Sequence, residues 1–275
     1  MLYFFAGLLF TASAAAVPLG YVVVPGGFAH AACVHEVAPG TVLEQRSLPE
    51  CPHPFLRSGG GPSNDTHGGA WKAWMQYSGS SPSSSVTALN STWSVPATPQ
   101  NEGGGQVLFW WNGVEPLDTS AVLQPVIQWG PSAAGGGNYW AYASWYVSSS
   151  HGSHFSQLVK IASGEKVLGT NTRSADGSWV ISASAPGKAP SVLKFKPVPG
   201  AWATAYHVLE AYGVSSDCSL YPAAGSVNFT GVALAIDDAP VAPIAWKALT
   251  QNAGCGEHAT ADASGQEVSI ITNTQ

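Results

Sequence analysis

Two polar side chains in apolar, strand-forming surroundings, Gln124 and Glu210, carry the clearest chemistry in this sequence. Gln124 lies in a run in which two faces of a strand separate cleanly: Val122, Gln124, Val126 and Gln128 on one, Leu123, Pro125, Ile127 and Trp129 on the other. An amide donates two hydrogen bonds and never ionises, so Gln124 can stabilise a developing oxyanion at any pH. Taken alone, a solvated strand face explains the same glutamine.

Glu210 lies in a second strand-like run, Thr204 to Tyr212. Alternation places Glu210 on one face with Tyr206, Val208 and Tyr212. If that face is buried, desolvation raises the pKa of the carboxyl group, which can then exchange protons near its working pH. Without a partner, a carboxylate on a wet strand face is the simpler interpretation.

A third run, Asn138 to Val147, is rich in aromatic residues. Alternation places Trp140, Tyr142, Ser144 and Tyr146 on one face. Aromatic residues in such a row either pack in a core or line a cleft for an extended polymer, and both interpretations stay open here.

The sequence predicts that short strands position these residues. From Ala70 onward, β-branched and aromatic runs alternate with turn residues, including a turn signal at Asn112-Gly113. This pattern predicts an all-β fold, an antiparallel β-sandwich of two packed sheets, over residues 70–275. No phosphate-binding loop or dinucleotide fingerprint is found, and His151 and His154 lack an evident third metal ligand, so no cofactor and no metal is expected.

The composition limits the partners. Only 9% of the 275 residues are charged, and the formal net charge is −6, which argues against nucleic acid. A chain with few Lys and Arg residues gains little positive charge as its carboxylates protonate, which suits an acidic medium.

The N-terminal part predicts secretion. Residues 1–16 resemble a signal peptide, although the uncharged run continues to Val24 and leaves a signal anchor open. Residues 17–69 form an extension that is either a removable propeptide or a permanent arm tied by a disulfide. Of the three pairings that four cysteines allow, we expect Cys33 with Cys51 and Cys218 with Cys255. Three sequons, at Asn64, Asn90 and Asn228, predict N-glycosylation.

Taken together, these pieces resemble the fungal glutamic peptidases, the eqolisin family of acid endopeptidases. The segments that carry the likeness are WWNGVEPLDTSAVLQ, AYASWYV, VKIASGEKVLGTNTR, YHVLEAY and SDCSLYPAAGSVNF, in that order. The resemblance implies a concanavalin A-like sandwich, with Gln124 and Glu210 as the catalytic pair. Trp111 matches a family Trp, with Trp110 as an alternative, and Glu115 matches a nearby acid. Gln128 and Ser144 stand where the family has acids.

The activity implied is secreted acid endopeptidase catalysis on protein or peptide substrates. Glu210 would act as general base and acid, and Gln124, together with Trp111, would hold the oxyanion. Substrate-binding positions would be Trp111, Glu115, Gln128, Tyr142, Ser144 and Tyr146. We expect a monomer, with no membrane contact after signal removal.

Two other functions remain open. A non-catalytic secreted carbohydrate-binding sandwich would share this composition, and a glycosidase would need a carboxylate pair that the strands do not offer. If Gln124 and Glu210 reach one shared site, the peptidase is favoured. If they lie on opposite sheets, the binding module is favoured.

Overall fold

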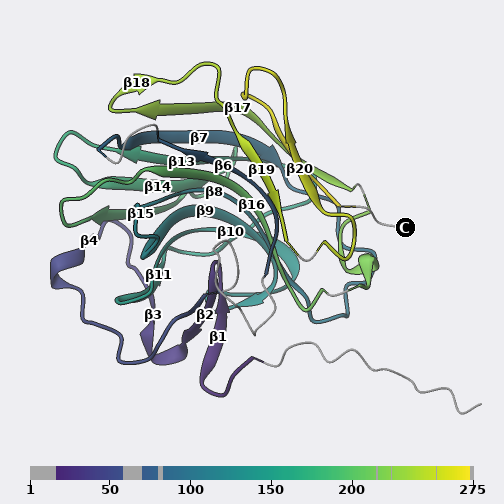
Figure 1. Cartoon of the computed structure of the whole chain (residues 1–275). Coiled ribbons are helices and arrows are strands. Elements are labelled where there is room, and N and C mark those ends of the chain that lie inside the picture. The colour runs from purple at the N-terminus through teal and green to yellow at the C-terminus, as the bar shows by residue number, and fades with distance from the viewer. Residues whose placement is uncertain are drawn as a thin grey trace, which may run out of the picture.

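The computed structural model describes residues 17–57, 70–79, 83–214, 216–223, 225–251 and 253–272. Within them, the chain forms two large sheets stacked face to face (Figure 1), which confirms the predicted β-sandwich. Helical structure in these ranges is limited to the 3₁₀ turns Ala31–Cys33, Gln45–Ser47 and Cys218–Leu220. The predicted signal at residues 1–16 and the sequon at Asn64 lie outside the described residues.

The first sheet, called the site sheet here, carries both candidate catalytic residues. Its strand order is β19-β6-β16-β8-β9-β10-β11-β3, and β12 also pairs with β10. The bounds are β19 Lys247–Thr250, β6 Trp71–Ser78, β16 Thr204–Tyr212, β8 Val107–Glu115, β9 Ala121–Ser132, β10 Gly135–Ser148, β11 Gly152–Phe155, β3 Val34–Glu36 and β12 Val159–Lys160.

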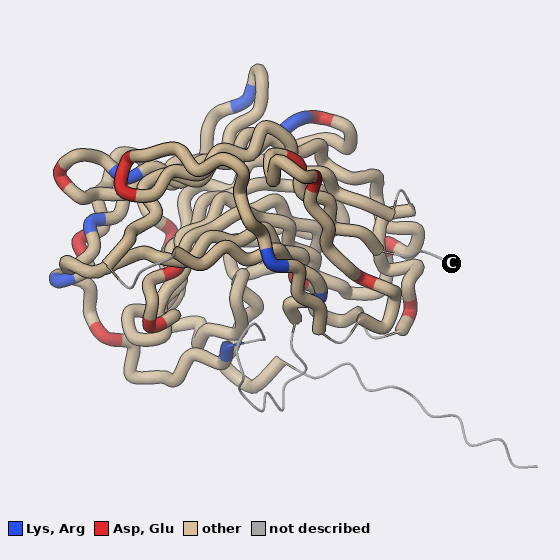
Figure 2. Tube along the Cα trace, turned by 45° about the horizontal axis from the view of Figure 1, so that its top comes forward, with Lys and Arg blue, Asp and Glu red and all other residues tan. Residues whose placement is uncertain are grey.

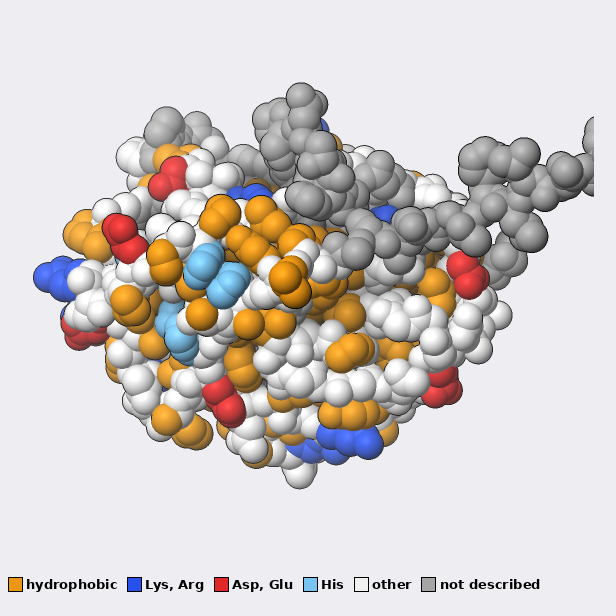
Figure 3. All heavy atoms as spheres, turned by 90° about the horizontal axis from the view of Figure 1, so that it is seen from below, with side chains coloured by type: hydrophobic (Ala, Val, Ile, Leu, Met, Phe, Trp, Pro, Cys, Tyr) orange, Lys and Arg blue, Asp and Glu red, His pale blue; other side chains and the backbone are white. Residues whose placement is uncertain are grey.

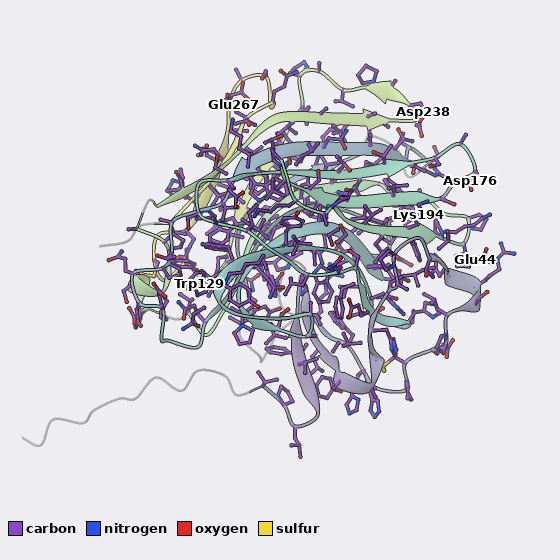
Figure 4. The ribbon with its side chains drawn as sticks, turned by 180° about the vertical axis from the view of Figure 1, so that it is seen from behind. Glu44, Trp129, Asp176, Lys194, Asp238 and Glu267 are labelled. Atoms are coloured by element: carbon purple, nitrogen blue, oxygen red, sulfur yellow. A yellow bond between two sulfur atoms is a disulfide. The ribbon has the colours of Figure 1, made fainter. Side chains whose placement is uncertain are left out.

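The second sheet, called the back sheet, has the order β20-β21-β17-β7-β13-β14-β15-β4, and β18 also pairs with β17. Its strands are β20 His258–Ala261, β21 Val268–Ile271, β17 Ser226–Ile236, β7 Val86–Ser94, β13 Lys166–Arg173, β14 Trp179–Ser184, β15 Ser191–Lys196, β4 Val42–Glu44 and β18 Ala239–Pro240. Charged residues are scattered over both sheets, mostly at loops and turns (Figure 2), and Glu44, Asp176, Lys194, Asp238 and Glu267 lie at the periphery (Figure 4).

The core between the sheets follows the alternation expected for β9. Leu123, Ile127 and Trp129 point toward the back sheet and join one continuous apolar cluster. Their neighbours Val122 and Val126 point the other way, yet they are also buried, in a second cluster on the outer face of the site sheet. Both faces of the site sheet are therefore covered.

The N-terminal segment, residues 17–57, covers that outer face. Its hairpin of β1 (Tyr21–Val24) and β2 (Gly27–His30) pairs with β5 (Leu56–Arg57) in a small third sheet. Val24, Phe28 and Ala29 pack into the second cluster, and the segment lies below the site sheet in Figure 1. Seen from below, hydrophobic side chains and histidines gather on this face (Figure 3).

The segment also pairs with one edge of each large sheet. β3 pairs in parallel with β11 of the site sheet, and β4 pairs in parallel with β15 of the back sheet. Cys33 and Cys51 are joined by a disulfide inside the segment, and Cys218 and Cys255 are joined inside the sandwich. Residues 17–57 of the extension thus form regular structure around an internal disulfide, which their sequence did not indicate.

One predicted turn is absent from its expected position. Asn112 and Gly113 lie inside β8, which continues to Glu115. The Asn112 side chain explains the continuation, since its amide donates to Ser91 Oγ at 2.7 Å and to the Gly169 carbonyl oxygen at 3.2 Å in the back sheet. Asn112 therefore links the two sheets.

Candidate active site

Gln124 and Glu210 lie on the same face of the site sheet, separated by one strand. The register pairs Glu210 of β16 with Phe109 of β8, and Phe109 with Gln128 of β9. Directly paired residues of an antiparallel sheet point to the same side, and Gln124 is an even number of residues from Gln128. Both side chains therefore point toward the N-terminal segment.

Glu210 is fully buried and its carboxylate is surrounded by donors. The Gly26 amide donates to Oε1 at 2.8 Å and to Oε2 at 2.9 Å. The Trp111 indole nitrogen donates to Oε2 at 3.3 Å, and the Tyr212 hydroxyl donates to Oε1. Hydrogen bonds to a charged acceptor are the strong ones, so this carboxylate is firmly positioned.

Gln124 is fully buried as well, and it meets the same turn of the N-terminal segment. Its Nε2 donates to the Pro25 carbonyl oxygen at 3.4 Å. Its Oε1 has no hydrogen-bond partner among the described residues. The donor end of the amide is thus the end that faces the bound turn.

The two residues hold a single peptide unit between them. The Pro25 carbonyl is bound by Gln124, and the Gly26 amide of the same peptide group is bound by Glu210. This is the pair of groups that a scissile peptide bond would present, a carbonyl oxygen that becomes an oxyanion and a nitrogen that becomes the leaving group. The geometric condition for the peptidase, a site that both side chains reach, is met.

The indole ring of Trp111 occupies the space that a side chain at position 113 would fill. A Cβ atom on Gly113 would lie 2.9 Å from Trp111 Cζ3 and 2.9 Å from the Leu123 carbonyl oxygen. The indole ring therefore lies over Gly113 and directs its nitrogen at Glu210. Trp111 contacts the carboxylate and not the Pro25 carbonyl, so its position differs from that expected of an oxyanion donor.

Glu115, at the end of β8, is 1% exposed and pairs with Arg57 of the N-terminal segment. Arg57 Nη2 lies 2.5 Å from Glu115 Oε1, and Arg57 Nη1 donates to the Thr119 carbonyl oxygen. Burial raises the pKa of Glu115 to about 7, while Arg57 and a hydrogen bond with Tyr206 act in the opposite direction.

Gln128 faces the same side as Gln124 but serves the β9–β10 hairpin. Its Nε2 donates to the carbonyl oxygens of Gly130 and Gly135, and its Oε1 accepts from Ser132 Oγ at 2.9 Å. Its amide is bonded at both ends within the hairpin, so its contacts are structural and not those of a substrate-binding residue.

The face expected for Tyr142, Ser144 and Tyr146 requires correction. These residues do share a face, but it is the one that packs on the back sheet. Tyr142 Oη donates to the Ala189 carbonyl oxygen and Ser144 Oγ to that of Ser191, while the Tyr146 ring stacks on Phe195 with centroids 4.1 Å apart. The register of β10 on β9 gives the reason, because Trp145 and not Ser144 is paired with Gln124.

The residues that β10 does present to the site are Ala143, Trp145 and Val147, all buried in the second cluster. Sequence reasoning also missed the turn at Pro25 and Gly26, as well as Arg57. A Pro-Gly-Gly sequence does signal a turn, and Tyr212 already shared the predicted face of Glu210. No local signal connects the turn to Gln124 or Glu210, because they lie 99 and 184 positions further along the chain.

The remaining two sequons differ in their exposure. Asn228 of β17 is exposed, whereas Asn90 lies in the middle of β7, partly buried between β13 and β17. Asn228 is thus the more accessible acceptor.

Comparison with known proteins is informative at the level of structure. No family model and no curated protein matches the sequence. The crystal structure of scytalido-glutamic peptidase with a peptide-based transition-state analogue is similar to this chain, with a TM-score of 0.51 and 17% identity, over 74% of this chain and 98% of that one. SCP-B, a member of the eqolisin family of peptidases, in complex with the tripeptide Ala-Ile-His gives a TM-score of 0.49 and 16% identity over the same shares. The β-sandwich described above therefore has a fold similar to that of scytalido-glutamic peptidase.

Proposed function

We propose that this chain is a secreted acid endopeptidase of the glutamic type, in which Glu210 is the general base and acid and Gln124 the oxyanion donor. The observation that supports the proposal most directly is the peptide unit of Pro25 and Gly26, bound by Gln124 through its carbonyl and by Glu210 through its nitrogen. A pair of residues arranged for this contact can receive the peptide bond of a substrate in the same place.

The chemistry follows from the two side chains. With the turn displaced, the ionised Glu210 carboxylate would bind a water molecule and remove its proton as the oxygen attacks the scissile carbonyl carbon. Gln124 would donate to the resulting oxyanion, a contribution of roughly 3 to 4 kcal/mol to barrier lowering. The protonated Glu210 would then give its proton to the leaving nitrogen, which restores the carboxylate.

Trp111 and Tyr212 would position the base in this mechanism. Their donor groups contact different oxygens of Glu210 and so restrict the rotation of the carboxylate. Neither residue needs to change protonation for the reaction to proceed.

We further propose that the N-terminal extension, residues 17–69, is a propeptide that inhibits the peptidase. In the described arrangement the Gly26 amide contacts both carboxylate oxygens, so no attacking water can be activated while the turn is bound. The predicted secretory signal at residues 1–16 and the two disulfides agree with export to an oxidising compartment.

The test is a digest of denatured protein at acid pH by the secreted full chain, intact and after a nick introduced between residues 58 and 69. We expect the nicked chain to release peptides, Gln124→Ala to lose about two to three orders of magnitude in kcat, and Glu210→Gln to lose activity altogether. Wild-type turnover by either variant would exclude Gln124 and Glu210 as the catalytic dyad. Binding of an oligosaccharide without any proteolysis would favour a carbohydrate-binding module instead.

A further inference from the structure

The back sheet carries a groove that the proposed peptidase mechanism does not use. It is lined by residues of three neighbouring strands, β17, β7 and β13, and of the loops that adjoin them (Figure 1). β17 pairs with β21 from Ser226 onward but with β7 only from Phe229, because β7 ends at Ser94. The residues of β17 that precede Phe229 therefore border a groove on this side instead of a paired strand.

The groove combines hydroxyl groups with a short apolar wall. Its volume is about 560 Å³, within the range of roughly 300 to 1,000 Å³ that small-molecule sites occupy. The apolar wall follows the end of β7 and includes Pro96 and Ala97, while polar side chains come from all three strands: Thr92, Ser94, Lys166, Ser226 and Thr230. No carboxylate occurs among the described lining residues. Such a set of donors and acceptors suits a neutral ligand that is rich in hydroxyl groups.

Asn228 can bring a ligand of this kind to the groove. It is the first residue of the sequon Asn228-Phe229-Thr230, and it lines the groove itself. Its exposed side chain alternates with the buried Val227 and Phe229, so it points away from the core. A sugar attached to this amide would start inside the groove.

The covalent link determines which sugar would fill the groove. A ligand on a short flexible tether has an effective concentration in the millimolar range. A groove that binds free saccharide with only millimolar affinity would therefore be substantially occupied by the sugar on Asn228. Attachment thus favours the chain's own glycan over a free saccharide as the occupant.

We propose that Asn228 carries an N-linked glycan whose first sugar residues lie in this groove, against Pro96, with Ser94 and Lys166 as hydrogen-bond partners. Attachment joins the Asn228 Nδ2 atom to the anomeric carbon of a lipid-linked oligosaccharide, with the lipid diphosphate as leaving group and loss of one amide proton. The docked glycan covers the end of β7 and the loop before β13. This inference uses the predicted secretion, and its tests do not depend on peptidase activity.

The first experiment measures occupancy. The full chain is secreted from a eukaryotic host that attaches N-glycans, and its glycopeptides are identified by mass spectrometry. We expect the peptide that contains Asn228 to carry a glycan and Asn228→Gln to remove it. A secreted wild-type chain without a glycan at Asn228 would overturn the proposal.

The second experiment uses hydrogen exchange to locate the sugar. The Val95 amide donates to the Glu165 carbonyl oxygen, and the Gly164 amide donates to the Val95 carbonyl oxygen, each at 2.8 Å, in the wall of the groove. Exchange of both amides should be about tenfold slower in the glycosylated chain than in Asn228→Gln, the factor that about one net hydrogen bond to the sugar supplies. Equal exchange would place the glycan in solvent and overturn the proposal.

Asn228→Gln combined with Asp176→Asn is the matched control, because it moves the sequon to the exposed turn between β13 and β14. β13 begins in the groove at Lys166, so this turn lies at the opposite end of the strand. A glycan there should leave the exchange of the Val95 and Gly164 amides at the level of Asn228→Gln. Protection equal to that of the wild type would reveal a general effect of glycosylation and overturn docking in the groove.

A further pair of variants tests the groove without altering the sequon. Lys166→Met removes the ammonium group that lines the groove, whereas Lys194→Met removes the same charge from an exposed residue of β15 (Figure 4). In the glycosylated chain, Lys166→Met should lose most of the protection and Lys194→Met should keep it. Full protection in both variants would overturn the assignment of the groove, and this pair decides the question even if the moved sequon receives no glycan.

Discussion

The amide nitrogen of Gly26 lies 2.8 Å from one carboxylate oxygen of Glu210 and 2.9 Å from the other. One donor thus spans both oxygens of the residue proposed as the base, across 184 positions of sequence. Since Gly26 has a φ of +92°, the turn that delivers this donor depends on a backbone conformation that other residues rarely adopt.

Gly26→Pro should release the turn from the dyad. Proline has no N–H to offer Glu210, and its fixed negative φ is incompatible with the native value. We expect faster hydrogen exchange in residues 17–57 and peptide cleavage by the uncut chain at least about tenfold above that of the intact wild type. Gly40→Pro is the control, because Gly40 also has a positive φ, of +83°, in the same segment and far from the dyad. Equal activation by both variants would point to general loosening of the segment.

Gly113→Ala should displace Trp111 from Glu210. The added methyl group would meet the indole ring and the Leu123 carbonyl oxygen at 2.9 Å, and overpacking of this kind costs about 1 to 3 kcal/mol in stability. We expect peptide cleavage to fall about tenfold or more, and Trp111→Phe, which lacks the indole N–H, to show a comparable loss. Gly200→Ala serves as the reference, since nothing lies within 4 Å of the added atom. Full activity in Gly113→Ala would show that the indole does not position the base.

Glu115 should make the protein less stable as the pH rises. Burial raises its folded-state pKa from 4.5 to about 7, so the folded state holds a proton that the unfolded state has lost between these values. Stability from this group is complete below pH 4.5 and is lost as the pH rises to about 7, by up to about 3 kcal/mol. Denaturant unfolding of Glu115→Gln should therefore match the wild type at pH 4 and exceed it at pH 8. A constant difference across this range would contradict the assignment.

His207 should make the protein less stable as the pH falls. It is fully buried against Phe229 and Trp246 between the sheets, and desolvation lowers its pKa from 6.5 to about 3. The unfolded state therefore binds a proton that the folded state refuses, and stability falls as the pH drops from 6.5 toward 3. His207→Phe should flatten this loss, which can reach about 4 kcal/mol at pH 3. The Ser91 hydroxyl accepts from Asn112 and also contacts His207, so His207→Phe removes one of its two partners and lowers stability by an amount that does not depend on pH. The change of stability with pH, and not its absolute value, is therefore the readout. An unchanged pH profile in His207→Phe would contradict the shift.

The sequence could predict the strands of Gln124 and Glu210 because both are rich in β-branched and aromatic residues. In β9 the large apolar residues face the core, whereas in β16 Tyr206, Val208 and Tyr212 share the face of Glu210. In β10 the sequence does not indicate which face is turned toward the core, because both faces carry aromatic and small residues. Tyr142 and Trp145 are equally suited to either side, and only pairing with β9 decides which one faces the cleft.

The N-terminal segment could not be predicted as structure for a different reason. Its strands are two to four residues long, too short to show a periodicity. Two of them, β3 and β4, are stabilised by pairing with the edges of sheets formed much later in the chain. Arg57 and Glu115 are likewise 58 positions apart, and neither residue type alone indicates the other.

The placement of the Cys33–Cys51 disulfide has a consequence for how inhibition would end. Both cysteines lie inside the N-terminal segment, so among the described disulfides none ties it to the sandwich, and the chain between residues 57 and 70 is the covalent connection. While that connection is intact, the turn meets the dyad at a high effective concentration set by the tether. A single cut there would turn the segment into a separate ligand, and dilution would then govern how much of the cleft is free.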